Sequence, residues 1–228
     1  MSMTISPSKF GSSNYFQILG NGKAENMQKE NFKKPYIPYS FNALEPIIDT
    51  LTLRTHFYMH TNSYDRLCDL LGCSVETKTI DSIFNVENNI LDEKISNAGL
   101  LYNHQLYWNN LSPYGGEMES DLQKAINSEF KSIYIFKLEF LKKALRHETN
   151  GWVWLILDDQ KKLKIVTTFA NINPLMSLAP EKGVPLLAID LWEHAFSSYN
   201  FCNKKGYLRK IWMLINWNEV SSRYRSAF

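Results

Sequence analysis

The stretch at residues 185–194, Pro-Leu-Leu-Ala-Ile-Asp-Leu-Trp-Glu-His, constrains this chain more than any other. It predicts a buried strand that ends at Asp190, followed four residues later by His194. A carboxylate at the end of so apolar a strand is costly to bury unless a positive group meets it. Since Asp oxygen and His nitrogen both bind first-row metals, a metal ion is one candidate. The alternative is an Asp190 that caps the next helix and a His194 that packs against it.

Composition narrows the class of protein. The chain has 228 residues, of which 44% are hydrophobic and 21% charged, as is typical of a soluble globular protein with one or two domains. A net charge of +2 without a long basic run gives no reason to expect nucleic-acid binding. No apolar run approaches the roughly eighteen residues of a membrane span. The three cysteines have neither the number nor the spacing of a disulfide framework or a zinc knuckle, so a reducing compartment is expected.

Residues 1–35 are rich in Ser, Asn, Gly and Lys, and we expect a disordered leader. They contain no hydrophobic core of a secretory signal. Arg is absent and Glu25 and Glu30 are present, which argues against a mitochondrial presequence. The sequence leaves the compartment open between the cytoplasm and the mitochondrial matrix, and the protein is not expected to be secreted.

Helical periodicity predicts a first long helix that begins near residue 50 and ends at Gly72. His56, His60 and Tyr64 follow one another at intervals of four, so they share one stripe of this helix. The flanking apolar residues place the stripe inward. Since a buried His needs a partner, we interpret at least one of the two histidines as a ligand.

A second helix is predicted over residues 98–111, with His104 and Trp108 on its apolar face. A short helix is expected near 81–85, and residues 112–116, Ser-Pro-Tyr-Gly-Gly, end the second long helix. The two long helices predict an antiparallel hairpin.

The second half of the chain mixes helices and strands. We expect helices over 119–131 and 133–146, a hairpin of strands over 151–157 and 163–169, a third strand before Asp190, and a Trp-rich helical region over 207–220. The fold class is therefore α+β: a leader (1–35), a helical-hairpin domain (36–116) and a C-terminal domain with a three-stranded antiparallel sheet (117–228).

Four candidate ligands come from three separate elements: His56, His104, Asp190 and His194. Two lie in each half, so a metal would sit in the seam and join the halves. Three His and one Asp suit Fe or Mn and also tolerate Zn.

The chain resembles the iron/manganese superoxide dismutase family from about residue 35 to residue 222. Five blocks carry the resemblance, in family-like order and spacing. They are Leu-Glu-Pro at 44–46 with Thr-Leu-Arg-Thr-His at 52–56, Asn-His-Gln-Leu-Tyr-Trp at 103–108, Leu-Ser-Pro at 111–113, Gly-Trp-Val-Trp-Leu at 151–155, and residues 185–195 with Asn-Trp at 216–217.

The resemblance implies that His56, His104, Asp190 and His194 hold one Fe or Mn ion. It implies that the protein disproportionates superoxide to dioxygen and hydrogen peroxide, an antioxidant activity.

The resemblance also implies roles around the ion. His60 and Tyr64 would form the substrate gateway. Glu193 would reach across a homodimer interface to the partner subunit's His194 and orient that ligand. An apolar wall would be made by Trp108, Trp152 and Trp192.

Four positions depart from the family pattern. The family orients the solvent on the metal with a Gln in one of two places, and here those places hold Leu100 and Ile172, the latter flanked by asparagines. Ser197 replaces a Tyr that contacts the partner, and Lys204 replaces an Arg, which keeps the charge but loses the bidentate fork. Activity could fall far while metal binding survives.

Three hypotheses follow. The first is an Fe- or Mn-dependent superoxide dismutase with altered surroundings of the metal. The second is a weak or inactive member that serves as a subunit of a larger assembly, such as a mitochondrial ribosome; the four ligands argue against it, and the missing Gln, Ser197 and the leader argue for it. The third, a hydrolytic zinc site, lacks an evident general base beyond Glu193.

Overall fold

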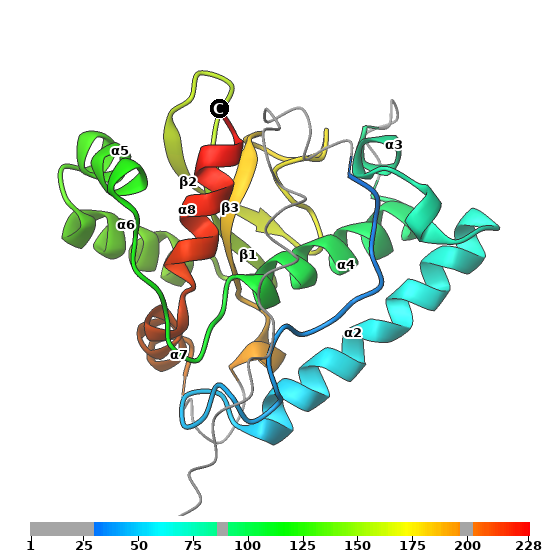
Figure 1. The fold of residues 1–228 in the computed structure, drawn as a ribbon. Helices are drawn as coiled ribbons and strands as arrows, with labels where there is room; N and C mark the ends of the chain where they lie inside the picture. Colours follow the sequence, from blue (N-terminus) through cyan, green and yellow to red (C-terminus); the bar gives the residue numbers. More distant parts are fainter. Residues whose placement is uncertain (1–29, 86–90, 197–202) are drawn as a thin grey trace, which may run out of the picture.

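The computed structural model describes residues 30–85, 91–196 and 203–228. A long helical hairpin lies beside a second lobe that is built on three strands and several helices (Figure 1). The predicted α+β class, with a helical hairpin followed by a three-stranded antiparallel sheet, is confirmed.

The hairpin consists of α2 (Thr50–Leu71) and α4 (Glu93–Asn109), which pack along each other. The carboxylate of Asp49 caps α2 and accepts the N–H of Thr52, which satisfies one of the free donors of the first turn. Arg66, near the end of α2, pairs with Glu93 at the start of α4, so the two helices run antiparallel.

The second long helix differs from its predicted bounds. It begins at Glu93, not at residue 98, because the carboxylate of Asp92 accepts the N–H of Ile95 and caps it. The apolar periodicity becomes clear only from Ala98 onward, so the first turn was missed. The helix stops before Leu111, which forms an isolated bridge with Ile215 instead.

The sheet has the order β2–β1–β3, with all pairs antiparallel. Its strands are β1 (Gly151–Leu157), β2 (Leu163–Phe169) and β3 (Val184–Asp190). The central strand β1 is buried at every position, which explains its unbroken run of apolar residues. Trp152 stands opposite Asp190 in the register, so the pairing places an indole beside the last residue of β3.

Four further helices belong to the sheet lobe: α5 (Ser120–Phe130), α6 (Ile133–Arg146), α7 (Lys204–Ile211) and α8 (Trp217–Ser226). α6 packs on β1 and β2, and α8 packs on β3, in front of the sheet in Figure 1. The helical region predicted over 207–220 is divided between α7 and α8, a break that the prediction did not include. The chain is extended at Ile215 because its bridge to Leu111 interrupts the helix.

The buried residues form two cores. The larger surrounds the sheet and joins it to α4. The smaller lies at the far end of the hairpin, between α2, α3 (Ile80–Phe84) and α4, and includes Phe32 and Ile172. Phe32 belongs to the predicted leader, yet it is buried against Phe84. Residues 1–29 lie outside the described part of the chain, and the boundary at residue 35 stays a prediction.

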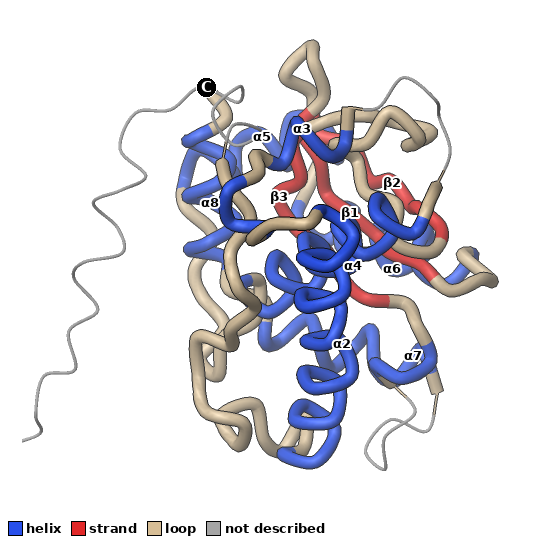
Figure 2. The backbone as a smooth tube through the Cα atoms, turned by 90° about the vertical axis from the view of Figure 1, so that its right-hand side faces the viewer, coloured by secondary structure: helices blue, strands red, loops and turns tan. Residues whose placement is uncertain are grey.

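Short 3-10 helices complete the described elements: η1 (Val75–Thr77), η2 (Glu193–Ala195) and η3 (Trp212–Leu214). Figure 2, turned by 90°, shows α2 running along the molecule with α4 beside it. Among the described residues, no helix combines the length and apolarity that crossing a membrane requires.

Gly99 lets α4 approach the loop after β2, which generates a prediction about stability. A Cβ at this position would lie 2.2 Å from the carbonyl oxygen of Asn171 and 2.6 Å from Cε of Met176. We expect Gly99→Ala to lower the free energy of unfolding by about 1–3 kcal/mol, measured by urea denaturation, because overpacking outweighs the gain in helix propensity. Gly206→Ala is the control, since a Cβ there meets only Asn203 Oδ1 at 3.6 Å. Equal stability of the two variants would contradict the close approach.

Candidate metal centre

Both lobes contribute side chains to a cluster at their junction. α2 supplies His56 and His60, one turn apart on its inward face, and α4 supplies His104. Asp190 is the last residue of β3, and His194 follows in η2. Because α2 contacts η2 and α4 contacts β3, side chains far apart in sequence meet at this point.

The carboxylate of Asp190 stands at the centre of three imidazoles. Its Oδ2 lies 3.2 Å from Nε2 of His56, 3.5 Å from Nε2 of His104 and 3.4 Å from Nε2 of His194. This oxygen is fully buried and makes no hydrogen bond with any described residue. A buried carboxylate oxygen without a donor, surrounded by imidazole nitrogens, is the arrangement that a metal cation would complete.

The imidazole nitrogens also converge on one another. Nε2 of His56 and Nε2 of His104 are 3.1 Å apart, as are Nε2 of His60 and Nε2 of His194. The ligand atoms of all four histidines lie within 4.8 Å of one another. Nδ1 of His104 lies 2.9 Å from the carbonyl oxygen of Leu100, so it donates its proton there and leaves the Nε2 lone pair facing the cluster.

The shifted pKa values of the clustered side chains favour the deprotonated forms, which can bind a metal cation. Burial lowers the pKa of His56 to about 4, and burial together with the neighbouring imidazoles lowers the pKa of His60 further. Burial by itself would raise the pKa of Asp190, but the surrounding His104, His194 and His56 bring it well below its usual value. Near neutral pH the site therefore offers an ionised carboxylate and uncharged His56 and His60 rings, which are the forms that bind metals.

The position of Asp190 is fixed from two sides. Its Oδ1 accepts the backbone N–H of Trp192 at 2.9 Å, and its backbone pairs with Trp152 in the sheet. The carboxylate thus turns back over the end of β3, with Oδ2 free to face the histidines.

Indole rings form part of the wall around the cluster. The rings of His104 and Trp152 meet edge to face at 4.9 Å, Trp108 lies 5.7 Å from His104, and Trp192 lies 5.7 Å from His194. The indole nitrogens of the three tryptophans are buried without a hydrogen-bond partner among the described residues. The three indoles therefore lie beside the clustered histidines, and their role as an apolar wall around an ion stays a prediction.

His60 lies directly beside the other imidazoles, and its predicted role at a substrate gateway stays a prediction. It is buried among the other imidazoles, with its ring 3.9 Å from that of His104. Two sets of four donors are thus available, one with Asp190 and one with His60. We favour the set with Asp190, because the Oδ2 atom approaches His56, His104 and His194, whereas no ion-pair contact joins it to His60 in the described chain.

Tyr64 lies one turn beyond His60 on α2. Its hydroxyl interacts with Ser74 and Glu76, and the amine of Lys34 lies 5.9 Å from its ring. None of the contacts between described residues joins Tyr64 to the cluster. Its predicted role at a gateway therefore stays a prediction.

The two positions that lack the family's Gln are occupied as the sequence indicated. Leu100 is half-buried, and Ile172 is buried in the smaller core. The neighbouring amides are engaged elsewhere: Asn173 Nδ2 donates to Asn103 Oδ1 at 3.0 Å, and Asn103 Nδ2 donates to the Asn171 carbonyl at 3.1 Å. This buried network ties the loop to the residue before His104, and sequence analysis did not predict it.

The structure describes two of three further positions that the sequence analysis singled out. Glu193 is exposed in the single chain, beside His194, whose side chain is 20% exposed. Lys204 donates to the carbonyl of His147. Ser197 lies outside the described residues.

A buried pair of tyrosines was also missed. The hydroxyls of Tyr107 and Tyr207 are 3.1 Å apart, and the Tyr107 ring lies 5.8 Å from that of His56. Burial raises the pKa of both phenols, so both stay protonated. In the sequence, each tyrosine lies at an ordinary core-facing position of its helix, and only the fold brings the two together.

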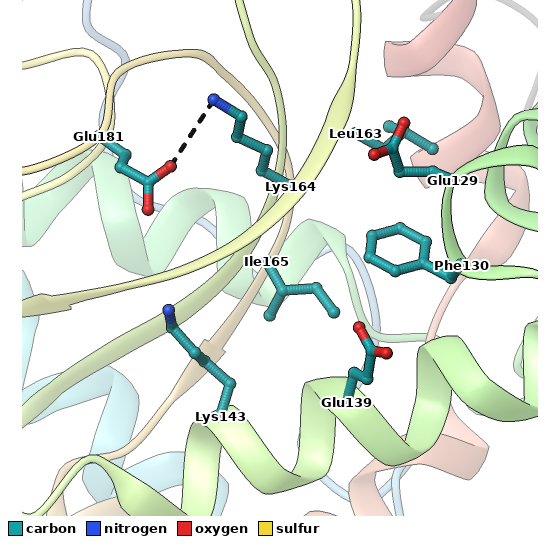
Figure 3. A pocket seen from close by; sticks show the side chains of 8 residues that line it. All are labelled: Glu129, Phe130, Glu139, Lys143, Leu163, Lys164, Ile165 and Glu181. Carbon is teal, nitrogen blue, oxygen red and sulfur yellow. Dashed lines mark ion pairs between the residues drawn. The ribbon is translucent and has the colours of Figure 1, made fainter.

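A surface hollow lies elsewhere on the molecule. Its walls come from α5, α6, β2 and the loop before β3, and carry charges of both signs, with Lys164 paired to Glu181 at 3.8 Å (Figure 3). It contains none of the clustered histidines, so the converging side chains and not this hollow identify the site.

Two family models match nearly the whole described chain. The model for iron/manganese superoxide dismutases, alpha-hairpin domain, matches residues 31–112, and the model for their C-terminal domain matches residues 118–223. The chain belongs to the iron/manganese superoxide dismutase family. Members of this family use Fe or Mn, and the histidine cluster is able to bind one ion.

Individual relatives support the same assignment. A superoxide dismutase [Mn] of Acinetobacter baylyi is 34% identical over 206 residues, which cover 86% of this chain and 88% of the relative. A superoxide dismutase [Mn] of Buchnera aphidicola subsp. Baizongia pistaciae is 35% identical over 200 residues, or 83% of this chain and 95% of the relative.

The buried imidazoles predict acid sensitivity of the metal-free dismutase-family protein. Because the pKa of His56 is about 4 in the folded chain and near 6.5 when unfolded, the unfolded state binds more protons below pH 6.5. We expect stability to fall by about 3 kcal/mol from this group as the pH drops from 6.5 to 4, measured by urea unfolding after chelation. The variant His56→Gln should show a shallower decline. Parallel profiles for the two proteins would contradict this assignment.

Proposed function

We propose that this chain is a superoxide dismutase, which converts superoxide to dioxygen and hydrogen peroxide at one Fe or Mn ion held by His56, His104, Asp190 and His194. The observation that carries the proposal is the approach of three imidazole nitrogens to the orphaned Oδ2 of Asp190. Family membership supplies the class of reaction.

The chain's own side chains have separate tasks. One anionic and three imidazole donors would hold the ion in the seam, and the hydrogen bond from His104 to Leu100 would keep one donor oriented. A bound Fe or Mn ion would supply the one-electron oxidation and reduction that superoxide requires. The indoles of Trp108 and Trp152 would exclude water, which strengthens electrostatic interactions inside the cavity. His60, beside His194, is the side chain that would meet an incoming anion.

The choice between Fe and Mn stays open in this proposal. The named relatives are manganese enzymes, whereas neither Leu100 nor Ile172 offers the amide by which the family orients solvent. Hydrogen bonds and burial tune the potential of a metal centre, and about 59 mV changes a one-electron equilibrium tenfold. The absent amide is the observation that favours the second candidate, a member of weak or no activity that serves as a subunit of a larger assembly.

Metal binding and turnover test the proposal together. The purified chain, loaded separately with Fe, Mn or Zn, is expected to bind about one ion and to remove superoxide with Fe or Mn but not with Zn. Asp190→Asn should lower metal affinity and turnover by about 100-fold or more, because it removes the one anionic donor. Metal content is measured by elemental analysis and superoxide decay by stopped flow.

His147→Ala is the matched control, because His147 lies outside the cluster and contacts Thr149. It should keep both metal and turnover. Circular dichroism of metal-free Asp190→Asn establishes that the variant is folded. If the wild-type protein binds Fe or Mn and yet shows no turnover, the result favours the assembly subunit over the enzyme.

We also propose a homodimer in which Glu193 reaches the partner subunit's His194. Glu193 is exposed in the single chain, next to the partly exposed His194, and this exposure supports the role. Glu193→Gln is expected to raise the dimer dissociation constant by about tenfold or more, measured by analytical ultracentrifugation, because it removes a charge-assisted hydrogen bond. Glu181→Gln, an exposed acid away from the cluster, is the control. A monomeric wild-type protein would rule this interface out.

A further inference from the structure

Two cysteines flank the C-terminal end of α2. Gly72 ends the helix in the left-handed conformation, with φ of 63°, and its N–H donates to the carbonyl of Asp69 at 3.2 Å. The N–H of Cys73 donates to the carbonyl of Cys68 at 3.3 Å. This pair of hydrogen bonds defines a Schellman motif, in which Cys68 and Cys73 occupy the two positions whose side chains usually contact each other.

The motif places the two thiols where a disulfide is feasible. A direct backbone hydrogen bond draws the residues together, and disulfides span Cα separations of about 4.4–6.8 Å. Both cysteines are free and only partly buried, so small oxidants have access to them. Thr77 Oγ1 lies 3.7 Å from the sulfur of Cys73, which also holds this side chain at the helix end.

The same turn is connected to the stripe that carries the candidate metal centre. Cys68 lies one turn beyond Tyr64, which lies one turn beyond His60. The Tyr64 hydroxyl interacts with Ser74 and Glu76, which belong to the short segment that follows Cys73. A disulfide between Cys68 and Cys73 would therefore attach residues 73–76 to the end of α2, and these residues include the two that interact with Tyr64.

We propose that Cys68 and Cys73 are a peroxide-sensitive pair that forms a reversible disulfide across the end of α2. One thiolate attacks a peroxide oxygen, the O–O bond breaks, and hydroxide leaves and takes a proton to form water, which produces a sulfenic acid. The second thiolate attacks that sulfur, the S–O bond breaks, and a second water leaves. Two thiols lose two electrons in total, and one hydrogen peroxide gains them.

Hydrogen peroxide is also the product of the proposed function, so the pair would respond to the activity of its own chain. The pairing itself does not depend on that activity, because peroxide is added as a reagent in the test. A failure of the disulfide and a failure of the dismutase are therefore separate results.

Peptide mass spectrometry tests the proposal directly. Trypsin releases residues 67–78, which contain both cysteines, whereas Cys202 falls in a different peptide. The full-length protein is treated with hydrogen peroxide, which is then removed with catalase, and remaining thiols are alkylated under denaturing conditions. We expect the 67–78 peptide to lose two hydrogens and both alkylation sites, and dithiothreitol to restore them. Amide hydrogen exchange over residues 72–78 should slow in the oxidised protein.

Cysteine variants provide the controls. Cys202→Ser should keep the change in the 67–78 peptide, and Cys68→Ser or Cys73→Ser should abolish it. Oxidation of methionines in the same sample verifies that the peroxide dose was sufficient. The proposal is overturned if both thiols remain alkylatable at that dose, if each cysteine gains oxygen atoms separately, or if either one pairs with Cys202.

Discussion

The buried carboxylate of Asp190 is the constraint on which the rest of the structure depends. An uncompensated charge at this depth costs on the order of several kcal/mol, and no backbone or side-chain donor reaches its Oδ2 among the described residues. Three imidazoles from two lobes surround that oxygen instead. The charge is thus tolerable only if both lobes are in place, and a cation among these donors would bind them together. The family's metal use and the architecture are two aspects of the same electrostatic requirement.

The hairpin and the sheet are each suited to this requirement. α2 and α4 pack antiparallel, so His56 and His104 face each other across the hairpin with their Nε2 atoms 3.1 Å apart. On the other side, pairing with the fully buried β1 fixes where β3 ends and therefore where Asp190 turns. The helices and the strand hold His56, His104 and Asp190, whereas His194 lies in the 3-10 helix η2 next to the exposed Glu193.

The surroundings of the cluster distinguish this chain from the pattern that its sequence resembles. Ile172 is packed into the smaller core, where an amide would need a hydrogen-bond partner. The side chain of Asn173 donates to Asn103, which donates to the backbone carbonyl of Asn171, and the side chain of Asn171 donates to Ser96. These amides fix the loop against α4 and are not free to turn toward the histidines. The departure is therefore built into the packing, and any activity must rely on donors other than the usual amide.

The sequence by itself determined the elements and their order, because helical and alternating periodicity directly record which faces are buried. It also indicated His56, His104, Asp190 and His194, since metal ligands are chemically distinctive and the blocks around them resemble a family. The start of α4 at Glu93 and the break at Ile215 depended on a cap and a bridge that periodicity does not record. Only the tertiary structure decided that His60 joins the cluster and that asparagines from separate segments form one network. Those features depend on distances between residues, and side-chain identity and spacing along the chain do not specify such distances.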